Sequence, residues 1–148
     1  MKRRSIGPDG GERLGEIPLF EGVSLGQRRA LGRLVDAVEV EAGEAIMVEG
    51  SRGYEFMMIE EGEAEVLQNG ERIRLLGPGE FFGELAILDD GTPRTATVIA
   101  RTPLRGLAFT AHFLRELHDR VPLVGERLDR EARERLARDS RAAGAREP

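Results

Sequence analysis

The chain of 148 residues has no cysteine and only two histidines, His112 and His118. The absence of cysteine excludes a disulfide framework, an iron–sulfur cluster, a zinc ribbon and a thiol nucleophile. The two histidines are six residues apart, about 240° around a helix, so they do not converge on one metal ion. We therefore expect neither a metal site nor a cofactor.

Long apolar runs are also missing, and none approaches the roughly 18 residues of a membrane span. Residues 1–4 are Met, Lys, Arg and Arg, and they lead into Gly, Pro and Asp rather than the hydrophobic core of a signal peptide. We therefore expect a cytoplasmic protein without membrane contact.

Basic residues are outnumbered, with 22 Lys and Arg against 27 Asp and Glu and a formal net charge of −5. Sequence-independent binding to nucleic acid needs a clustered positive surface, so we expect no nucleic-acid partner. Lys2 is the single lysine. Because every other basic residue is arginine, one arginine by itself is weak evidence of function here.

Residues 37–109 contain short apolar runs that alternate with glycine-bearing turn pairs such as Asn69-Gly70. The runs recur about every 8–12 residues, which is typical of an antiparallel sandwich or barrel. Asn-Gly between two such runs is a strong hairpin signal. The length suits one domain with a single modest core.

Helical patterns flank this β region. Ser24 is a predicted N-cap for a helix over 25–35, and Thr110 is a predicted N-cap for a helix that stops or restarts at Pro122. From 122 to 141, apolar residues recur every four positions among acid-first i,i+4 ion pairs, which predicts a long, partly exposed helix.

The two ends of the chain differ in composition from the segments between them. Residues 1–15 are rich in glycine and charge, which predicts a flexible arm, and residues 142–148 resemble a frayed tail. We therefore place the folded domain at 16–141, with its β region at 37–109 and its C-terminal helices at 110–141.

One segment, residues 77–98, breaks the alternation of strands and turns. Gly83 precedes a short predicted helix, and a glycine there lets a ligand approach the backbone. The unpaired N–H groups that open such a helix would hold a phosphate over Leu85 and Ala86. Arg94 follows with a planar fork that suits two phosphate oxygens, and Thr95 adds a hydroxyl.

Glu84 in the same segment needs a different partner. A carboxylate in a phosphate pocket repels the ligand unless it accepts a hydrogen bond, and a sugar hydroxyl is a suitable donor. A lone Gly-Glu pair or a lone arginine would be structural. The ordered set of helix amides, glutamate and arginine instead describes a ligand with a phosphate and a ribose.

At these residues the chain resembles the cyclic nucleotide-binding domain family, which includes catabolite activator proteins, regulatory subunits of cAMP-dependent kinase and cyclic-nucleotide-gated channels. The phosphate-binding cassette of that family reads F-G-E-x-A, then a few small or aliphatic residues, then R-[TSA]-A. Here F-G-E-L-A occupies 82–86 and R-T-A occupies 94–96. The resemblance extends from about Pro18 to Arg138.

The resemblance implies a mainly β fold, an eight-stranded antiparallel, jelly-roll-like β-roll with an N-terminal helix, a short cassette helix and C-terminal helices. It places Glu84 on the ribose 2′-hydroxyl, Arg94 and Thr95 on the cyclic phosphate, and backbone amides near Leu85 and Ala86 around it. The remaining ligand-binding residues that it implies are Phe82, Gly83 and Ala96 in the cassette, Ile73 and Leu76 beside the base, and Arg135 as a lid on the final helix.

By the same resemblance we expect a sensor of a 3′,5′-cyclic mononucleotide, with cAMP favoured over cGMP. Its final helix would fold over the filled pocket and present a changed surface to a protein effector. The chain stops soon after that helix, so we expect either a stand-alone module without a helix-turn-helix or other output domain, which Met1 and the tail-like end favour, or a fragment of a longer protein. The effector is not identified by the sequence, and a homodimer through the C-terminal helix stays open.

Two other classes of function are alternatives to the sensor. A ligand-free interaction scaffold would keep the β-roll without the nucleotide, but the intact Glu84 and Arg94 argue against that loss. A phosphodiesterase or small-barrel oxygenase would need converging metal ligands, or an activated Ser or Cys beside a base. The sequence offers neither arrangement, so we do not expect an enzyme.

Overall fold

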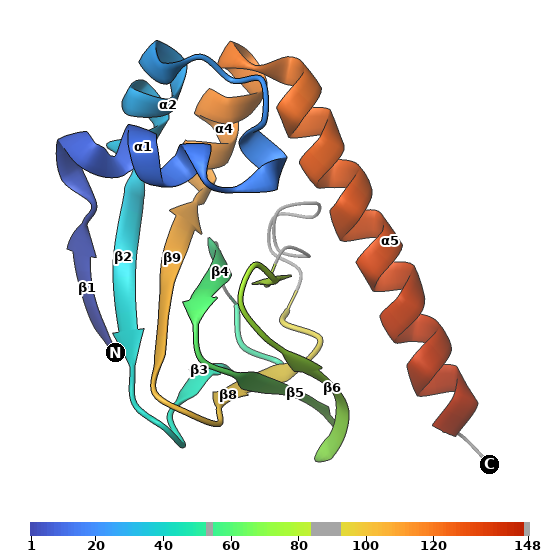
Figure 1. The fold of residues 1–148 in the computed structure, drawn as a ribbon. Coiled ribbons are helices and arrows are strands. Elements are labelled where there is room, and N and C mark those ends of the chain that lie inside the picture. Colours follow the sequence, from blue (N-terminus) through green and yellow to red (C-terminus); the bar gives the residue numbers. More distant parts are fainter. Residues whose placement is uncertain (53–54, 84–92, 147–148) are drawn as a thin grey trace.

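Two antiparallel sheets organise the protein in a computed structural model that describes residues 1–52, 55–83 and 93–146 (Figure 1). The first sheet has the strand order β1-β2-β9-β4-β7 and the second β3-β8-β5-β6. The first comprises β1 (Lys2–Ser5), β2 (Val35–Val40), β4 (Glu55–Glu61), β7 (Phe81–Phe82) and β9 (Leu104–Thr110). The second comprises β3 (Ala45–Met47), β5 (Ala64–Gln68), β6 (Glu71–Leu76) and β8 (Thr97–Ala100).

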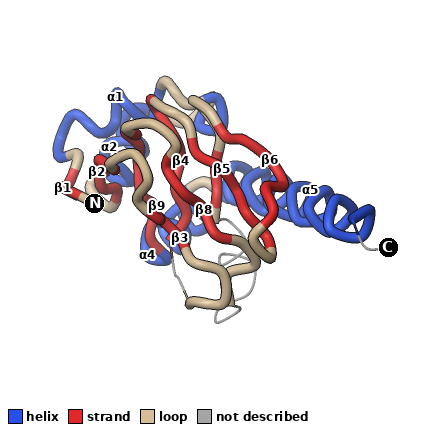
Figure 2. Tube along the Cα trace, turned by 90° about the horizontal axis from the view of Figure 1, so that it is seen from below, coloured by secondary structure: helices blue, strands red, loops and turns tan. Residues whose placement is uncertain are grey.

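Helices cover one end of the first sheet. Figure 1 shows α1, α2 and α4 packed together there, whereas α5 runs down one side of the molecule. Viewed from below, the C-terminal part of α5 extends beyond the strands (Figure 2). The helical elements are η1 (Gly7–Asp9), α1 (Gly10–Gly15), η2 (Pro18–Phe20), α2 (Leu25–Gly32), α4 (Ala111–Arg120) and α5 (Pro122–Arg146).

The predicted fold class is confirmed, because β2 to β9 supply the strands of an antiparallel β-roll and helices flank them. The hairpin between β5 and β6 turns at Asn69 and Gly70, whose φ angles are +52° and +79°. Two successive positive φ angles define the turn that matches strand twist, which explains the Asn-Gly pair.

Both predicted N-caps are confirmed. The Ser24 hydroxyl accepts from the Gln27 N–H at 3.2 Å, and the Thr110 hydroxyl accepts from the Phe113 N–H at 3.2 Å. Each bond satisfies one of the N–H groups that a helix leaves unpaired at its start.

The N-terminal segment differs from the expected flexible arm over 1–15. Strand β1 pairs antiparallel with β2, from Lys2 opposite Glu39 to Ser5 opposite Asp36. Helix α1 then buries Leu14 completely. The glycines and charged residues that predicted a flexible arm instead take part in packing and in ion pairs.

The C-terminal segment also differs, because α5 continues through residues 142–146, where a frayed tail was expected. Its N-terminal half is anchored by Val124, Leu128 and Ala132, each at most 3% exposed. Alanine has the highest helix propensity, and residues 142–145 include three alanines, which favours continuation of the helix.

Two apolar cores lie on opposite faces of the first sheet. The core between this sheet and the helices contains an aromatic cluster in which the ring centroids of Phe56 and Phe109 are 4.7 Å apart and those of Phe109 and Phe113 are 4.8 Å apart. The core between the two sheets includes Phe82 and Leu76. Strands β4 and β9 are therefore buried on both faces.

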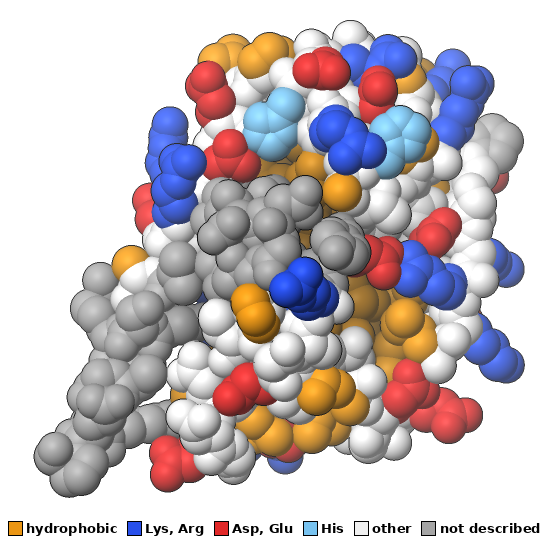
Figure 3. Space-filling view, turned by 180° about the vertical axis from the view of Figure 1, so that it is seen from behind, with side chains coloured by type: hydrophobic (Ala, Val, Ile, Leu, Met, Phe, Trp, Pro, Cys, Tyr) orange, Lys and Arg blue, Asp and Glu red, His pale blue; other side chains and the backbone are white. Residues whose placement is uncertain are grey.

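Helices α4 and α5 are joined through His118. Its Nδ1 lies 2.8 Å from the Leu114 carbonyl oxygen, and its Nε2 lies 3.1 Å from the Asp129 carboxylate on α5. A Cβ on Gly125 would lie 2.7 Å from this ring, so glycine lets the imidazole approach α5 closely. At this end of the molecule charged side chains of both signs and the histidines reach the surface (Figure 3).

Both ring nitrogens of His118 face acceptors, and only the imidazolium can donate to both. Burial lowers the pKa of His118, but the Leu114 carbonyl and the carboxylates of Asp129 and Asp119 outweigh it, so this pKa lies above its ordinary value of 6.5. The folded protein therefore holds the proton more tightly than the unfolded chain does.

The resulting stabilisation is fully present below the unfolded pKa and is lost as the pH rises through the raised folded pKa. We predict that the stability difference between the parent protein and His118→Gln shrinks between about pH 6 and 8. The change should stay below about 1 kcal/mol because the pair is partly solvent-exposed. Urea unfolding across this range measures it, with the exposed His112→Gln as control. An equal difference at every pH would contradict this account.

Candidate functional site

The main chain of Arg94 is held by the segment that follows β3. The Arg94 N–H donates to the Ser51 carbonyl at 2.7 Å, and the Gly50 N–H donates to the Arg94 carbonyl at 2.8 Å. These two bonds form a short ladder just before β8. The arginine therefore starts from a fixed backbone position rather than from a free loop.

The side chain of Arg94 is held by two further backbone groups. Its Nη1 donates to the Gly83 carbonyl at 2.8 Å, and its Nη2 donates to the Glu55 carbonyl at 2.7 Å. Gly83 follows β7 and Glu55 begins β4, so the half-buried guanidinium links two strands of the first sheet. Its permanent positive charge thus has a defined position and plane.

Gly83 is required by this packing. Its φ is +82°, a conformation that residues with a side chain rarely adopt. A Cβ at this position would also collide with the Met47 methyl group and would lie 2.8 Å from Nη1 of Arg94. The glycine predicted for ligand approach is therefore also the residue that admits the arginine.

The apolar residues predicted around the ligand have different degrees of burial. Phe82 and Leu76 are buried in the core between the sheets, whereas Ile73 and Ala96 are half-buried and pack against that core. Thr95 is exposed, and its carbonyl accepts from the Gln68 amide at 3.1 Å. Phe82, Gly83 and Arg94 are therefore brought together, and Ala96 follows in the same segment.

Arg135 lies on α5 and is half-buried. It lines a cavity of about 200 Å³ together with Phe81 of β7 and with Leu128 and Ala132 of its own helix. Phe81 immediately precedes the cassette sequence, so the lid candidate faces the strand that leads into the candidate site. Its closure over a ligand stays a prediction.

Three predicted site residues, Glu84, Leu85 and Ala86, lie outside the described residues. The ribose contact, the amide cradle and the short cassette helix therefore stay predictions. The described part of the site is the Arg94 guanidinium, its two carbonyl partners and the apolar side chains next to them.

Sequence reasoning missed the groups that hold Arg94. The carbonyls of Gly83 and Glu55 belong to the backbone, so no residue type marks them. It also missed Arg3, whose guanidinium donates to the Glu55 carboxylate at 2.8 Å and to the Asp36 carboxylate at 3.0 Å. The hydrogen bond with Glu55 is the main cause that raises the pKa of Arg3. Glu55 therefore links the N-terminal strand to Arg94.

Nowhere in the part of the chain that the structure describes do three or more metal-ligating side chains gather. None of its helices is both long enough and apolar enough to cross a membrane.

Comparison with known families and proteins places this site in context. The family model for the cyclic nucleotide-binding domain matches residues 37–121. The cAMP-dependent protein kinase regulatory subunit of Aspergillus niger is 36% identical over 94 residues, which cover 62% of this chain and 23% of that protein. The chain spans a quarter or less of the curated relatives compared.

Solved structures agree with the fold. A cyclic nucleotide-binding domain from Methylobacillus flagellatus aligns with a TM-score of 0.72 over 97% of this chain and 87% of that chain, at 23% identity. The catabolite activator protein of Thermus thermophilus aligns with a TM-score of 0.72 over 86% of this chain and 62% of that chain, at 26% identity.

The close contact between Gly83 and Arg94 predicts the cost of a methyl group there. We expect Gly83→Ala to lower the free energy of unfolding by about 1 kcal/mol more than Gly79→Ala does, the low end of overpacking costs, because the ends of the Met47 and Arg94 side chains can shift. Gly79 is the matched control, because its φ is +86° but a Cβ there would meet nothing within 4 Å. Chemical denaturation of both variants measures the difference, and equal losses would show that backbone strain alone is responsible.

Proposed function

This chain belongs to the cyclic nucleotide-binding domain family, and we propose that it is a non-enzymatic module that binds a 3′,5′-cyclic mononucleotide. The observation that carries the proposal is the Arg94 guanidinium, fixed by the carbonyls of Gly83 and Glu55. A cation placed in this way meets an anionic phosphate with little loss of side-chain freedom.

We favour cAMP over cGMP as the ligand. Support comes from the fungal relatives, which are regulatory subunits of cAMP-dependent protein kinase. In this proposal Arg94 and Thr95 bind the cyclic phosphate, Glu84 accepts from the ribose 2′-hydroxyl, and amides near Leu85 and Ala86 complete the cradle. Ile73 and Leu76 contribute apolar surface on the side of the base.

The signal would pass through α5. If the state with Arg135 closed over the nucleotide binds more tightly than the open state, ligand shifts the population toward closure. The C-terminal part of the helix would then change its position relative to the β-roll. A protein effector, or a second copy of the chain, would read that change.

Calorimetric titration of nucleotide-stripped protein with cAMP, cGMP, AMP and a cyclic dinucleotide tests the proposal. We expect one cyclic mononucleotide to bind with micromolar or tighter affinity, and AMP to bind much more weakly. If none of the four binds, the sensor is rejected in favour of a ligand-free scaffold. Turnover of cAMP during incubation would instead indicate an enzyme.

Arg94→Ala is the decisive variant, because it removes charge-assisted bonds and leaves the phosphate without its cation. We expect a loss of about 3–5 kcal/mol, by analogy with a broken buried ion pair. That corresponds to a drop of roughly two to three and a half decades in affinity for the cyclic nucleotide. If Arg94→Ala keeps near-normal affinity in this titration, Arg94 does not bind the cyclic phosphate.

Arg3 should act as a positioning residue, because it binds the side chain of Glu55 while the carbonyl of Glu55 binds Arg94. We expect Arg3→Ala to weaken cyclic-nucleotide affinity by roughly three- to tenfold, the range of coupling between neighbouring residues. Arg4→Ala is the matched control, since its side chain points away from this chain of contacts. Equal affinities in the two variants would contradict the coupling, and Arg3→Lys should restore part of it.

A further inference from the structure

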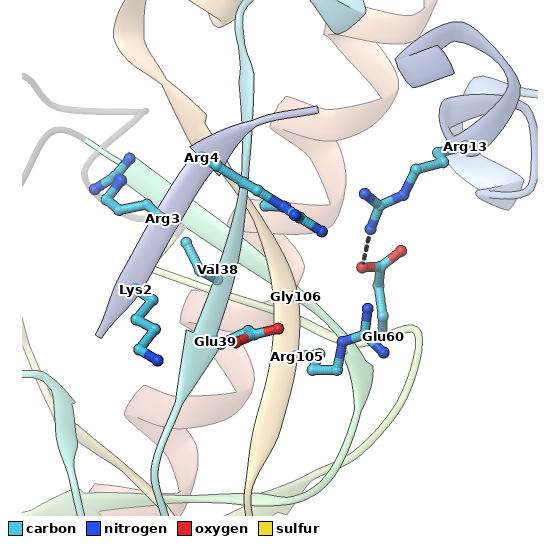
Figure 4. Close-up of a pocket in the computed structure, with 10 residues that line it drawn as sticks. Lys2, Arg3, Arg4, Arg13, Val38, Glu39, Glu60, Arg105 and Gly106 are labelled. Carbon is cyan, nitrogen blue, oxygen red and sulfur yellow. Dashed lines mark hydrogen bonds and ion pairs between the residues drawn. The ribbon is translucent and has the colours of Figure 1, made fainter. Parts of the chain in front are cut away.

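A second cationic cleft lies on the helix-covered side of the first sheet, at the edge formed by β1. It measures about 180 Å³ and is lined by residues from β1, β2, β9, α1 and the end of β4. Figure 4 shows its charged side chains, which are Lys2, Arg3, Arg4, Arg13, Glu39, Glu60 and Arg105. None of these side chains accepts the hydrogen bonds that Arg94 donates to the carbonyls of Gly83 and Glu55.

Strand register brings these side chains together. Glu39 of β2 lies opposite Lys2 of β1 and opposite Arg105 of β9. Residues directly opposite in antiparallel strands share one face, so a single carboxylate lies between two cations. Arg4, two residues after Lys2, faces the same side and lies opposite Ala37, which contributes no charge.

Helix α1 supplies the upper rim of the cleft. Arg13 reaches down from α1 and is paired with the Glu60 carboxylate (Figure 4). The side chain of Arg4 projects from the opposite side toward Arg13. Arg105 pairs only loosely, at 3.7 Å, with Glu61 at the exposed end of β4.

The charges of the cleft do not balance. Lys2, Arg4, Arg13 and Arg105 face the carboxylates of Glu39 and Glu60, and Glu61 at the rim pairs with Arg105, which leaves an excess of one positive charge in a protein whose net charge is −5. Arg3, which also borders the cleft, points away from it toward Asp36 and Glu55. Within the described part of the chain, the side chains of Lys2 and Arg4 make no hydrogen bond or ion pair.

We propose that this cleft is a second anion site, which binds a small multivalent oxyanion of the phosphate class. The Arg4 guanidinium can donate two parallel hydrogen bonds to such an anion, and Arg13 and Arg105 can add the N–H groups that do not bind Glu60 and Glu61. The bound charge would neutralise the excess and relieve repulsion between Arg4 and Arg13. Because the cleft is open to solvent, binding should weaken as salt concentration rises.

A purely structural role for the same residues makes different predictions. Basic side chains on an edge strand discourage pairing with other chains, and Glu39 between two cations would stabilise the sheet. In that case anions would not bind in a saturable manner. The two accounts therefore predict different effects of removing the Glu39 carboxylate. In the structural account its removal weakens the sheet, whereas in the proposal it frees two cations to bind an anion.

Titration with inorganic pyrophosphate at low ionic strength, followed by amide NMR, tests the proposal. We expect saturable shifts of the amides of Lys2, Arg4, Glu39 and Arg105, which are separable from any shifts at Arg94 and Thr95. Arg4→Gln should weaken binding at the cleft roughly tenfold, and Glu39→Gln should strengthen it several-fold. Arg115→Gln on α4 is the charge-matched control and should leave the affinity unchanged.

Three results would overturn the second site. They are the absence of saturable shifts at these amides, an equal loss of affinity in Arg115→Gln, and weaker binding in Glu39→Gln. The exposed Arg4 side chain has no partner among the described residues, so its variant should fold normally, and its amide spectrum shows whether it does. Cyclic-nucleotide affinity, measured separately, reports on the Arg94 site and does not depend on this outcome.

Discussion

The guanidinium of Arg94, held between the carbonyls of Gly83 and Glu55, is the interaction on which the candidate site depends. It joins the start of β4 to the chain just after β7, and the Arg94 main chain is tied to the segment after β3. Each of these segments belongs to a different part of the roll. A charge that would be mobile on an exposed loop is therefore placed by the fold itself, and Gly83 provides the space for it.

The candidate site and the stability of the domain depend on the same packing. The apolar side chains near Arg94 belong to the core between the sheets, so the site is supported by the packing that folds the domain. The helix that we propose to carry the signal is connected differently. Helix α5 is anchored through Val124 and Leu128 and through the His118 contact with Asp129, while its C-terminal part extends beyond the strands. In the proposed mechanism, one end of the helix stays attached while the other changes position.

Much of the fold and part of the site could be predicted from the sequence. Ser24, Thr110 and the Asn69-Gly70 pair mark local structure because their side chains or backbone angles act within a few residues. Arg94 and Gly83 were predicted because residue type and spacing describe a phosphate site. The carbonyl partners could not be predicted, since every residue carries a carbonyl and only the folded chain selects two of them.

The structure of the N-terminal segment also depends on contacts that form only in the folded chain. Its glycines and charges indicate disorder in composition, but Arg3 finds Asp36 and Glu55 only when β1 is beside β2. The length of α5 was underestimated because the apolar pattern thins out before the alanine-rich end of the helix. Both differences concern segments whose structure depends on long-range contacts or on weak propensities rather than on a clear apolar period.

A crystal structure of the protein bound to cAMP would test the central claim most directly. The account predicts that phosphate oxygens of the nucleotide lie within hydrogen-bond distance of the Arg94 guanidinium, and that this group keeps its contacts with Gly83 and Glu55. A nucleotide bound elsewhere, or an Arg94 side chain that leaves both carbonyls to reach it, would contradict the preformed site described above.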